Sequence, residues 1–175
     1  TQRDASDFLE FLVINRNPLP IQIVKHILYC SENGIAVNTQ VYTTLNYKES
    51  LADTESLELL VGKPCILVND DPVQYVRPDQ VFWNDHPFGP YRYKLGSGLR
   101  AYEELLKILG VRIEPEVRDY ISVLLDISDH FRNTPIDEIA SGVVMSCWHK
   151  LSEVLAAGQI SPEELRAGLH NQKVI

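Results

Sequence analysis

The chain has 175 residues, 45% of them hydrophobic and 23% charged, which is an ordinary balance for one compact globular domain or two small ones. Its formal net charge is −8 at pH 7. That acidic balance argues against a protein that binds duplex nucleic acid or docks on an anionic membrane, because both partners attract concentrated positive charge.

The first half of the chain is predicted to hold four helices. Polar cap residues or a proline mark where they begin, and glycines or an Asn-Pro pair mark where they end. They run from Ser6 or Asp4 to Asn17, from Pro20 to Gly34, from Asn38 through Leu45, and from Thr54 to Gly62. The chain opens at Thr1, without methionine, directly in the first predicted helix. We therefore expect it to be a fragment of a longer protein.

A β-hairpin is predicted at about residues 64–77. Cys65 to Val68 and Val73 to Val76 are short apolar runs, and the Asn-Asp-Asp-Pro sequence between them is typical of a turn. We expect Asp70 and Asp71 to be turn residues rather than a catalytic carboxylate pair, because a hairpin tip provides no cleft. Pro64 and Pro78 limit the length of the pairing.

The stretch from Asn84 to Gly98 is rich in glycine, proline and aromatic residues, and we predict a long ordered loop. Its second half, together with the start of the next predicted helix, contains the chain's one cluster of positive charge with interleaved aromatics, which is the candidate contact for a ligand or partner. Its residues are Arg92, Lys94, Arg100, Tyr91 and Tyr93. The alternative is a packed loop whose tyrosines cover the core while its charges stay hydrated.

The second half is predicted to be helical. The expected helices run from Leu99 to Gly110, from Pro115 to Phe131, from Thr134-Pro135 through Val154, and from Ser161 through Leu169. The third should turn Ile136, Ile139, Val143 and Cys147 inward. One connector pattern recurs in GIAVNTQV, GVRIEPEV and GQISPEEL: a glycine, a short extended segment and then the start of a helix. The pattern indicates either repeated helical hairpins or the same capping chemistry used three times.

Three cysteines, Cys30, Cys65 and Cys147, are scattered and form no CxxC motif, which is typical of a reducing compartment. We therefore predict a cytoplasmic protein. Cys65 starts an apolar strand and is expected to be buried and inert. His130 and Asp126 could form a functional pair, but a solvated ion pair one turn apart is the favoured explanation. No nucleotide, metal or serine-nucleophile motif occurs, so we expect no cofactor and no metal.

Two segments resemble a known group of proteins. They are LxxxPCI…VRPDQVFW, from Leu60 to Trp83, and GPYRYKLGSGLRAYEELLKILGVRIEPEVRDYISVLLDI, from Gly89 to Ile127. Both are similar to regions downstream of the Hsp90-like ATPase domain in sacsin and NO VEIN-like proteins. The matching positions are Pro64, Cys65, Ile66, Arg77, Pro78, Val81, Phe82, Leu109, Gly110, Val111 and Tyr120.

The resemblance implies a non-catalytic region, since the nucleotide site of those proteins lies in the ATPase domain. We therefore predict a mainly α domain, built of helix-turn-helix hairpins with one small β-hairpin, in two lobes at 1–88 and 89–175. Its expected function is that of a protein-interaction or scaffolding module of a large chaperone-like protein, binding other domains of that protein or a client. The alternatives are a nucleic-acid-binding, winged-helix-like module that uses residues 89–100, and an enzyme of unrecognised type.

Overall fold

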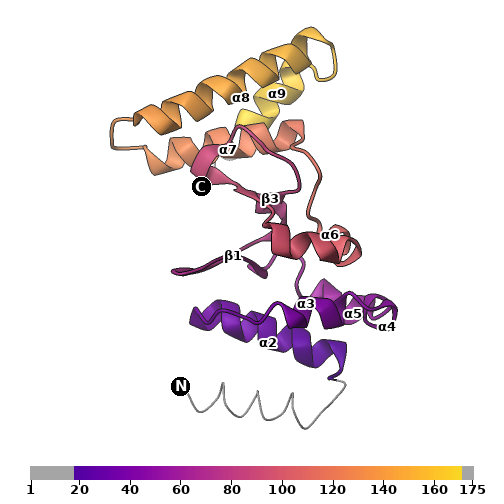
Figure 1. Cartoon of the computed structure of the whole chain (residues 1–175). Helices are drawn as coiled ribbons and strands as arrows, with labels where there is room; N and C mark the ends of the chain where they lie inside the picture. The colour runs from indigo at the N-terminus through magenta and orange to yellow at the C-terminus, as the bar shows by residue number, and fades with distance from the viewer. Residues whose placement is uncertain (1–17, 171–175) are drawn as a thin grey trace. The chain divides into compact units, whose positions relative to one another are not determined.

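The computed structural model describes residues 18–170 and confirms a mainly α fold with one small antiparallel hairpin (Figure 1). The helix predicted before Asn17 lies outside these residues. The chain forms two compact units. Unit 1 contains the described residues up to Asp79 together with Gly96–Val111, and unit 2 contains Gln80–Leu95 and the residues from Arg112 onward. The single boundary expected at 88/89 is thus replaced by three crossings of the chain, at 79/80, 95/96 and 111/112.

Unit 1 is built on short helices. They are α2 (Pro20–Asn33), α3 (Gln40–Leu45), α4 (Lys48–Leu51), α5 (Thr54–Glu58), the 3₁₀ segment η3 (Ser97–Tyr102) and α6 (Glu103–Leu109). Gly34 and Gly110 end α2 and α6 in the left-handed conformation, as predicted. The cap of α5 is not Thr54 but Asp53, whose carboxylate accepts from the Ser56 N–H at 3.1 Å. Helix α4 is an element that the sequence pattern did not predict.

Two tyrosine hydroxyls attach the predicted hairpin to the helical part of unit 1. Strands β1 (Ile66–Asp70) and β2 (Val73–Val76) pair antiparallel, with an irregularity between Leu67 and Asn69. The Tyr42 hydroxyl donates to the Cys65 carbonyl at 2.7 Å. The Tyr75 hydroxyl donates to the Ile35 carbonyl at 2.8 Å and accepts from the Val37 N–H at 2.9 Å. A short 3₁₀ turn, η1 (Pro78–Gln80), follows the hairpin.

Unit 2 begins with irregular chain that holds a second, parallel pair of strands. β3 (Val81–Phe82) pairs with β4 (Tyr93–Lys94), and the 3₁₀ turn η2 (Gly89–Tyr91) lies between them in the sequence. The Leu95 N–H donates to the Phe82 carbonyl at 2.8 Å, and the Trp83 N–H donates to the Arg112 carbonyl at 2.9 Å. The predicted long loop is therefore ordered, as expected, but part of it is strand.

Three helices complete unit 2: α7 (Val117–His130), α8 (Glu138–Ala156) and α9 (Pro162–His170), of which α8 and α9 both lie beside α7 (Figure 1). Their shared core contains Phe82, Phe88, Val123, Cys147 and Leu151. Helix α9 packs closely on α7, because a Cβ added at Gly168 would lie 3.0 Å from Cδ1 of Ile121.

Helix α8 starts later than predicted, and two apolar residues around its beginning are exposed. Asp137 caps it by accepting from the Ala140 N–H at 2.7 Å, so Thr134-Pro135 lies before the helix and not in its first turn. Ile136 and Ile139 were expected inside, but they are 48% and 65% exposed. Ile136 precedes the helix, so helical periodicity does not apply to it, and the buried face of α8 begins at Ala140 rather than at Ile139.

Candidate functional site

The predicted contact strip divides between the two units. Arg92, Lys94, Tyr91 and Tyr93 belong to unit 2, whereas Arg100 belongs to unit 1. Arg92 is buried, and the Lys94 ammonium pairs with the Asp85 carboxylate at 2.7 Å. Tyr91 packs against the core of unit 2. Whether the strip contacts a ligand stays a prediction, but its two cations in unit 2 already have carboxylate partners.

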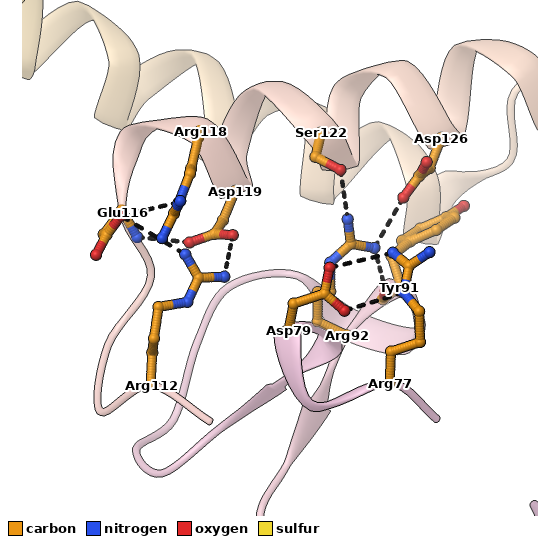
Figure 2. A network of polar contacts seen from close by, with 10 residues as sticks. All are labelled: Arg77, Asp79, Tyr91, Arg92, Arg112, Glu116, Arg118, Asp119, Ser122 and Asp126. Atoms are coloured by element: carbon orange, nitrogen blue, oxygen red, sulfur yellow. Dashed lines mark hydrogen bonds and ion pairs between the residues drawn. The ribbon is translucent and has the colours of Figure 1, made fainter. Parts of the chain in front are cut away.

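Arg92 fastens the irregular segment of unit 2 to α7 (Figure 2). Its guanidinium donates to the Asp126 carboxylate, the Ser122 hydroxyl and the Tyr91 carbonyl at 2.8, 2.8 and 2.7 Å. These charge-assisted bonds satisfy a buried cation, so its main role is structural. Ser122 and Asp126 both belong to α7, and their contacts with Arg92 join that helix to the segment after η2. Asp126 therefore bonds Arg92 in place of the functional pair considered with His130.

A second arginine holds the beginning of α7 in the same way (Figure 2). Arg112 pairs with the buried Asp119 carboxylate, which also accepts from the Glu116 N–H at 2.7 Å. The Arg112 guanidinium carbon lies 5.3 Å from the centroid of the Phe82 ring. Figure 2 also draws the exposed Arg77–Asp79 pair of unit 1, whose closest nitrogen–oxygen distance is 3.0 Å.

The three thiols are buried, and each is held in its neutral form. Burial raises the pKa of Cys65 to about 12 and that of Cys147 to about 11, and it also raises the pKa of Cys30. The thiol of Cys30 lies 3.5 Å from Nε2 of His26, whose pKa burial lowers. A neutral thiol beside a neutral imidazole lacks the thiolate that nucleophilic chemistry needs.

Among residues 18–170, no cluster of three or more His, Cys, Asp or Glu side chains could hold a metal ion. No helix in that part of the chain is long and apolar enough to cross a membrane.

A groove of about 810 Å³ lies along α7, α8 and the end of α9 in unit 2. Eight apolar and three polar side chains line it. The apolar wall includes Phe131, Ile136, Trp148 and Leu169, and the polar residues are Ser128, Asp129 and Arg132. Trp148 is 44% exposed, although it lies on a helix that packs into a core. A partly exposed tryptophan in a groove with mostly apolar lining residues is typical of a contact surface.

A smaller hollow of about 240 Å³ shares Trp148 and Leu169 with this groove. Leu155, Pro162, Leu165 and Arg166 complete its lining. We call the two hollows together the α7–α9 groove. Seven Lys and Arg residues of unit 2 lie in the described part of the chain, and Arg166 is the one without an ion pair to any described residue. Its positive charge is therefore available to a partner at the edge of an apolar surface.

Sequence reasoning missed this groove because it assigned Ile136 to the interior and did not single out Trp148. The usable signal was the position of Asp137, which can cap α8 and so leaves Ile136 before the helix. Comparisons of the chain with family models, curated proteins and solved structures give no match. The likeness to the sacsin and NO VEIN-like group therefore stays a prediction.

Proposed function

We propose that the chain is a non-catalytic protein-interaction module and that the α7–α9 groove binds an amphipathic helix of a partner protein. The observation that carries this proposal is the groove of about 810 Å³, in which eight of eleven lining residues are apolar and the partly exposed Trp148 forms part of the wall. Covering a large apolar side chain contributes about 1.5–3 kcal/mol, so two or three such anchors supply a useful affinity. The partner is proposed to be a helix because the groove lies along helices, where apolar anchors one or two turns apart on an incoming helix can pack.

Charge complementarity specifies the partner further. Arg166 has no ion pair to a described residue, whereas the neighbouring Arg132 bonds Asp129 at 2.7 Å. A carboxylate on the incoming helix would compensate Arg166 at the edge of the second hollow. The proposed partner segment is therefore amphipathic, with large apolar residues on one face and a Glu or Asp beside them.

The resemblance of Leu60–Trp83 and Gly89–Ile127 to sacsin and NO VEIN-like proteins leads us to propose a parent protein as well. In that proposal the chain is one module of a large, cytoplasmic, chaperone-like protein, and its partner is another domain of that protein or a client. The isolated chain should then neither bind nor hydrolyse Mg-ATP. A thermal shift with Mg-ATP, or release of phosphate, would contradict this part of the proposal.

The alternatives have less support. A nucleic-acid-binding strip would have to exchange the Arg92–Asp126 and Lys94–Asp85 pairs for phosphates. An enzyme centred on Cys65 would need a thiolate from a group whose pKa is raised to about 12. An enzyme centred on Asp126 would have to release the Arg92 guanidinium.

The test uses a fluorescein-labelled helical peptide of about 16 residues, with leucines at i, i+4, i+7 and i+11 and one glutamate beside them. Fluorescence anisotropy should show saturable binding to the full chain. Trp148→Ala should weaken binding roughly 30-fold, the effect of truncating one central aromatic anchor. Met145→Ala is the matched control, because Met145 is an exposed apolar residue of α8 that lines neither hollow. Equal effects of the two substitutions, or no binding, would contradict the proposal.

The carboxylate is tested by a double-mutant cycle. A peptide with glutamine in place of glutamate should bind the wild-type chain roughly 3- to 10-fold more weakly. Arg166→Ala should bind both peptides equally. A glutamate preference that persists in Arg166→Ala would remove the assigned role of Arg166 while leaving the groove itself in place.

A further inference from the structure

His86 lies between β3 and η2, with its ring beside two aromatic side chains. Its ring centroid is 5.3 Å from that of Phe82, edge to face, and 5.3 Å from that of Phe88, stacked. Nδ1 accepts a hydrogen bond from the Phe88 backbone N–H at 3.3 Å. Nε2 is shielded from solvent and has no partner at ordinary hydrogen-bond geometry among the described residues, although the Tyr93 backbone lies near enough to the ring to favour its protonated form. The ring is thus built into the segment that leads to η2.

This geometry requires a neutral ring. Nδ1 can accept a hydrogen bond only while it carries no proton, which places the imidazole proton on Nε2. In the imidazolium form both ring nitrogens are donors, so Nδ1–H would face the Phe88 N–H. The turn from His86 to Phe88 would then lose the bond that closes it.

The turn positions a residue of the core. Phe88 is fully buried, and its ring centroid lies 4.9 Å from that of Tyr120, edge to face. The chain continues directly from Phe88 through η2 to Arg92, whose guanidinium bonds α7. Opening the turn therefore affects one core aromatic and one arginine contact in the same short segment.

The charged groups around the ring are Asp85, Arg92 and Arg112. Asp85 favours the imidazolium, but its carboxylate is exposed and bonds the Lys94 ammonium. Arg92 opposes the imidazolium and is itself bonded to Asp126. Arg112 lies over the Phe82 ring that contacts His86 and pairs with Asp119. Burial is the largest influence and lowers the pKa of His86 from 6.5, against smaller opposing contributions from the Tyr93 backbone and Asp85.

We propose that His86 makes the segment from Asn84 to Leu95 an acid-sensitive latch, in which protonation of the ring opens the 86–88 turn and loosens Phe88, η2 and the Arg92 contacts together. None of these residues lines the α7–α9 groove, so the proposal goes beyond the proposed function and is independent of it. The chemical signal that operates the latch is the proton.

The direction of the effect follows from the lowered pKa. As the pH falls through the unfolded-state value of 6.5, the unfolded chain takes up the proton before the folded chain does. The stability contributed by neutral His86 is therefore complete above that value. It falls as the pH drops toward the lower folded-state pKa, and it then stays constant.

The experiment measures amide hydrogen exchange by NMR on the full chain at about pH 7.5 and about pH 5, with intrinsic exchange rates divided out. The informative amides are those of Phe88 and Leu95, because the Leu95 N–H bonds the Phe82 carbonyl at 2.8 Å. Protection of both should fall roughly 3- to 10-fold at the lower pH, which is the equilibrium factor of one ordinary hydrogen bond. Protection of the Cys147 amide in α8 should not change.

Two variants complete the design. In His86→Asn the side-chain oxygen can still accept from the N–H two residues on, but nothing titrates, so protection should be equal at both pH values. His149→Asn removes an exposed histidine and should behave as the wild type does. Unchanged protection in the wild type, or an equal loss in His86→Asn, would overturn the proposal.

A direct titration keeps the proposal testable even if His86→Asn does not fold. The NMR signal of the His86 Cε1 proton in the wild-type chain should titrate below 6.5, and the Phe88 amide shift should move with it. An ordinary pKa, or a titration that leaves the Phe88 amide shift in place, would overturn the latch.

Discussion

Unit 1 and unit 2 attach their irregular segments to their helices by different chemistry. In unit 1 the hydroxyls of Tyr42 and Tyr75 bond backbone groups of the hairpin and of the α2–α3 connection. In unit 2 the guanidinium of Arg92 bonds a carboxylate, a hydroxyl and a carbonyl. The strength of a hydrogen bond between neutral groups does not depend on salt or on the protonation of a carboxylate. The strength of an ion pair depends on both. The two units should therefore respond differently to salt and acid.

Burial keeps the two tyrosine hydroxyls of unit 1 neutral. Burial raises the pKa of Tyr75 to about 12, and it raises the pKa of Tyr42 as well. Both hydroxyls therefore keep their protons at any physiological pH and remain hydrogen-bond donors. The Arg92 guanidinium is permanently charged, so in unit 2 the carboxylate is the partner that can change state.

The largest expected effect comes from removing the arginine contact of unit 2. Arg92→Met should destabilise the protein by about 3 kcal/mol, because three hydrogen bonds of a charged group are lost while the half-exposed Asp126 is rehydrated. Urea unfolding followed by tryptophan fluorescence measures this, since both tryptophans, Trp83 and Trp148, belong to unit 2. Ser122→Ala removes one of the three bonds and should cost about 1 kcal/mol. Equal losses in the two variants would contradict the role given to the ion pair.

The corresponding change in unit 1 should be smaller and independent of salt. Tyr42→Phe removes the hydroxyl that bonds the Cys65 carbonyl at 2.7 Å in a buried setting, and should cost about 2 kcal/mol. The urea midpoints of the wild type and of this variant should differ by the same amount at low and at high salt. A difference that shrinks as salt is added would contradict the distinction between the two units.

Tyr75→Phe tests the second hydroxyl of unit 1. Its side chain is half-buried, so water can replace part of what is lost, and we expect a cost of about 1 kcal/mol. Hydrogen exchange of the Val37 amide, which donates to this hydroxyl, should rise in the variant. Exchange unaltered at Val37 would show that the bond does not stabilise the α2–α3 connection.

The smallest expected effect concerns Cys65. Cys65→Ser should cost about 1 kcal/mol, at the lower end of the range for burying a hydroxyl, because the new hydroxyl can turn toward the Leu60 carbonyl but lies farther from it than the 3.6 Å of the thiol sulfur. Peptide binding by the α7–α9 groove should not change. In the native wild type, thiol labelling of Cys65 should be slow, and it should become fast in denaturant. Fast labelling of the native chain would restore the reactive-thiol hypothesis.

Local signals in the sequence predicted most of the secondary structure. Pro20 and Gly34 bound α2, and the Asn-Asp-Asp-Pro turn separates β1 from β2. These features depend on residues that are near in sequence, where capping and turn preferences act directly. A prediction from the same preferences placed the start of α8 a few residues too early, so it wrongly assigned Ile136 to the inward face of the helix.

The features that the sequence did not predict depend on distant residues. Strands β3 and β4 have two residues each, and their pairing has no local pattern. Arg92 and Asp126 are 34 positions apart, so no periodicity connects them. The α7–α9 groove needs α9 to pack against α7 at Gly168, which only tertiary structure can show. Candidate sites assembled across elements could therefore not be predicted, whereas the burial of the Cys65 thiol was predicted correctly from the apolar run that it begins.

The most direct test of the interaction function is an NMR titration of the isotope-labelled chain with the unlabelled amphipathic peptide. Shift changes should concentrate on the Trp148 indole N–H and on the amides of Phe131 and Leu169, which line the α7–α9 groove. The strip at Arg92 and Lys94 should stay unchanged. Changes confined to that strip, or no changes at peptide concentrations well above the anisotropy midpoint, would contradict the account.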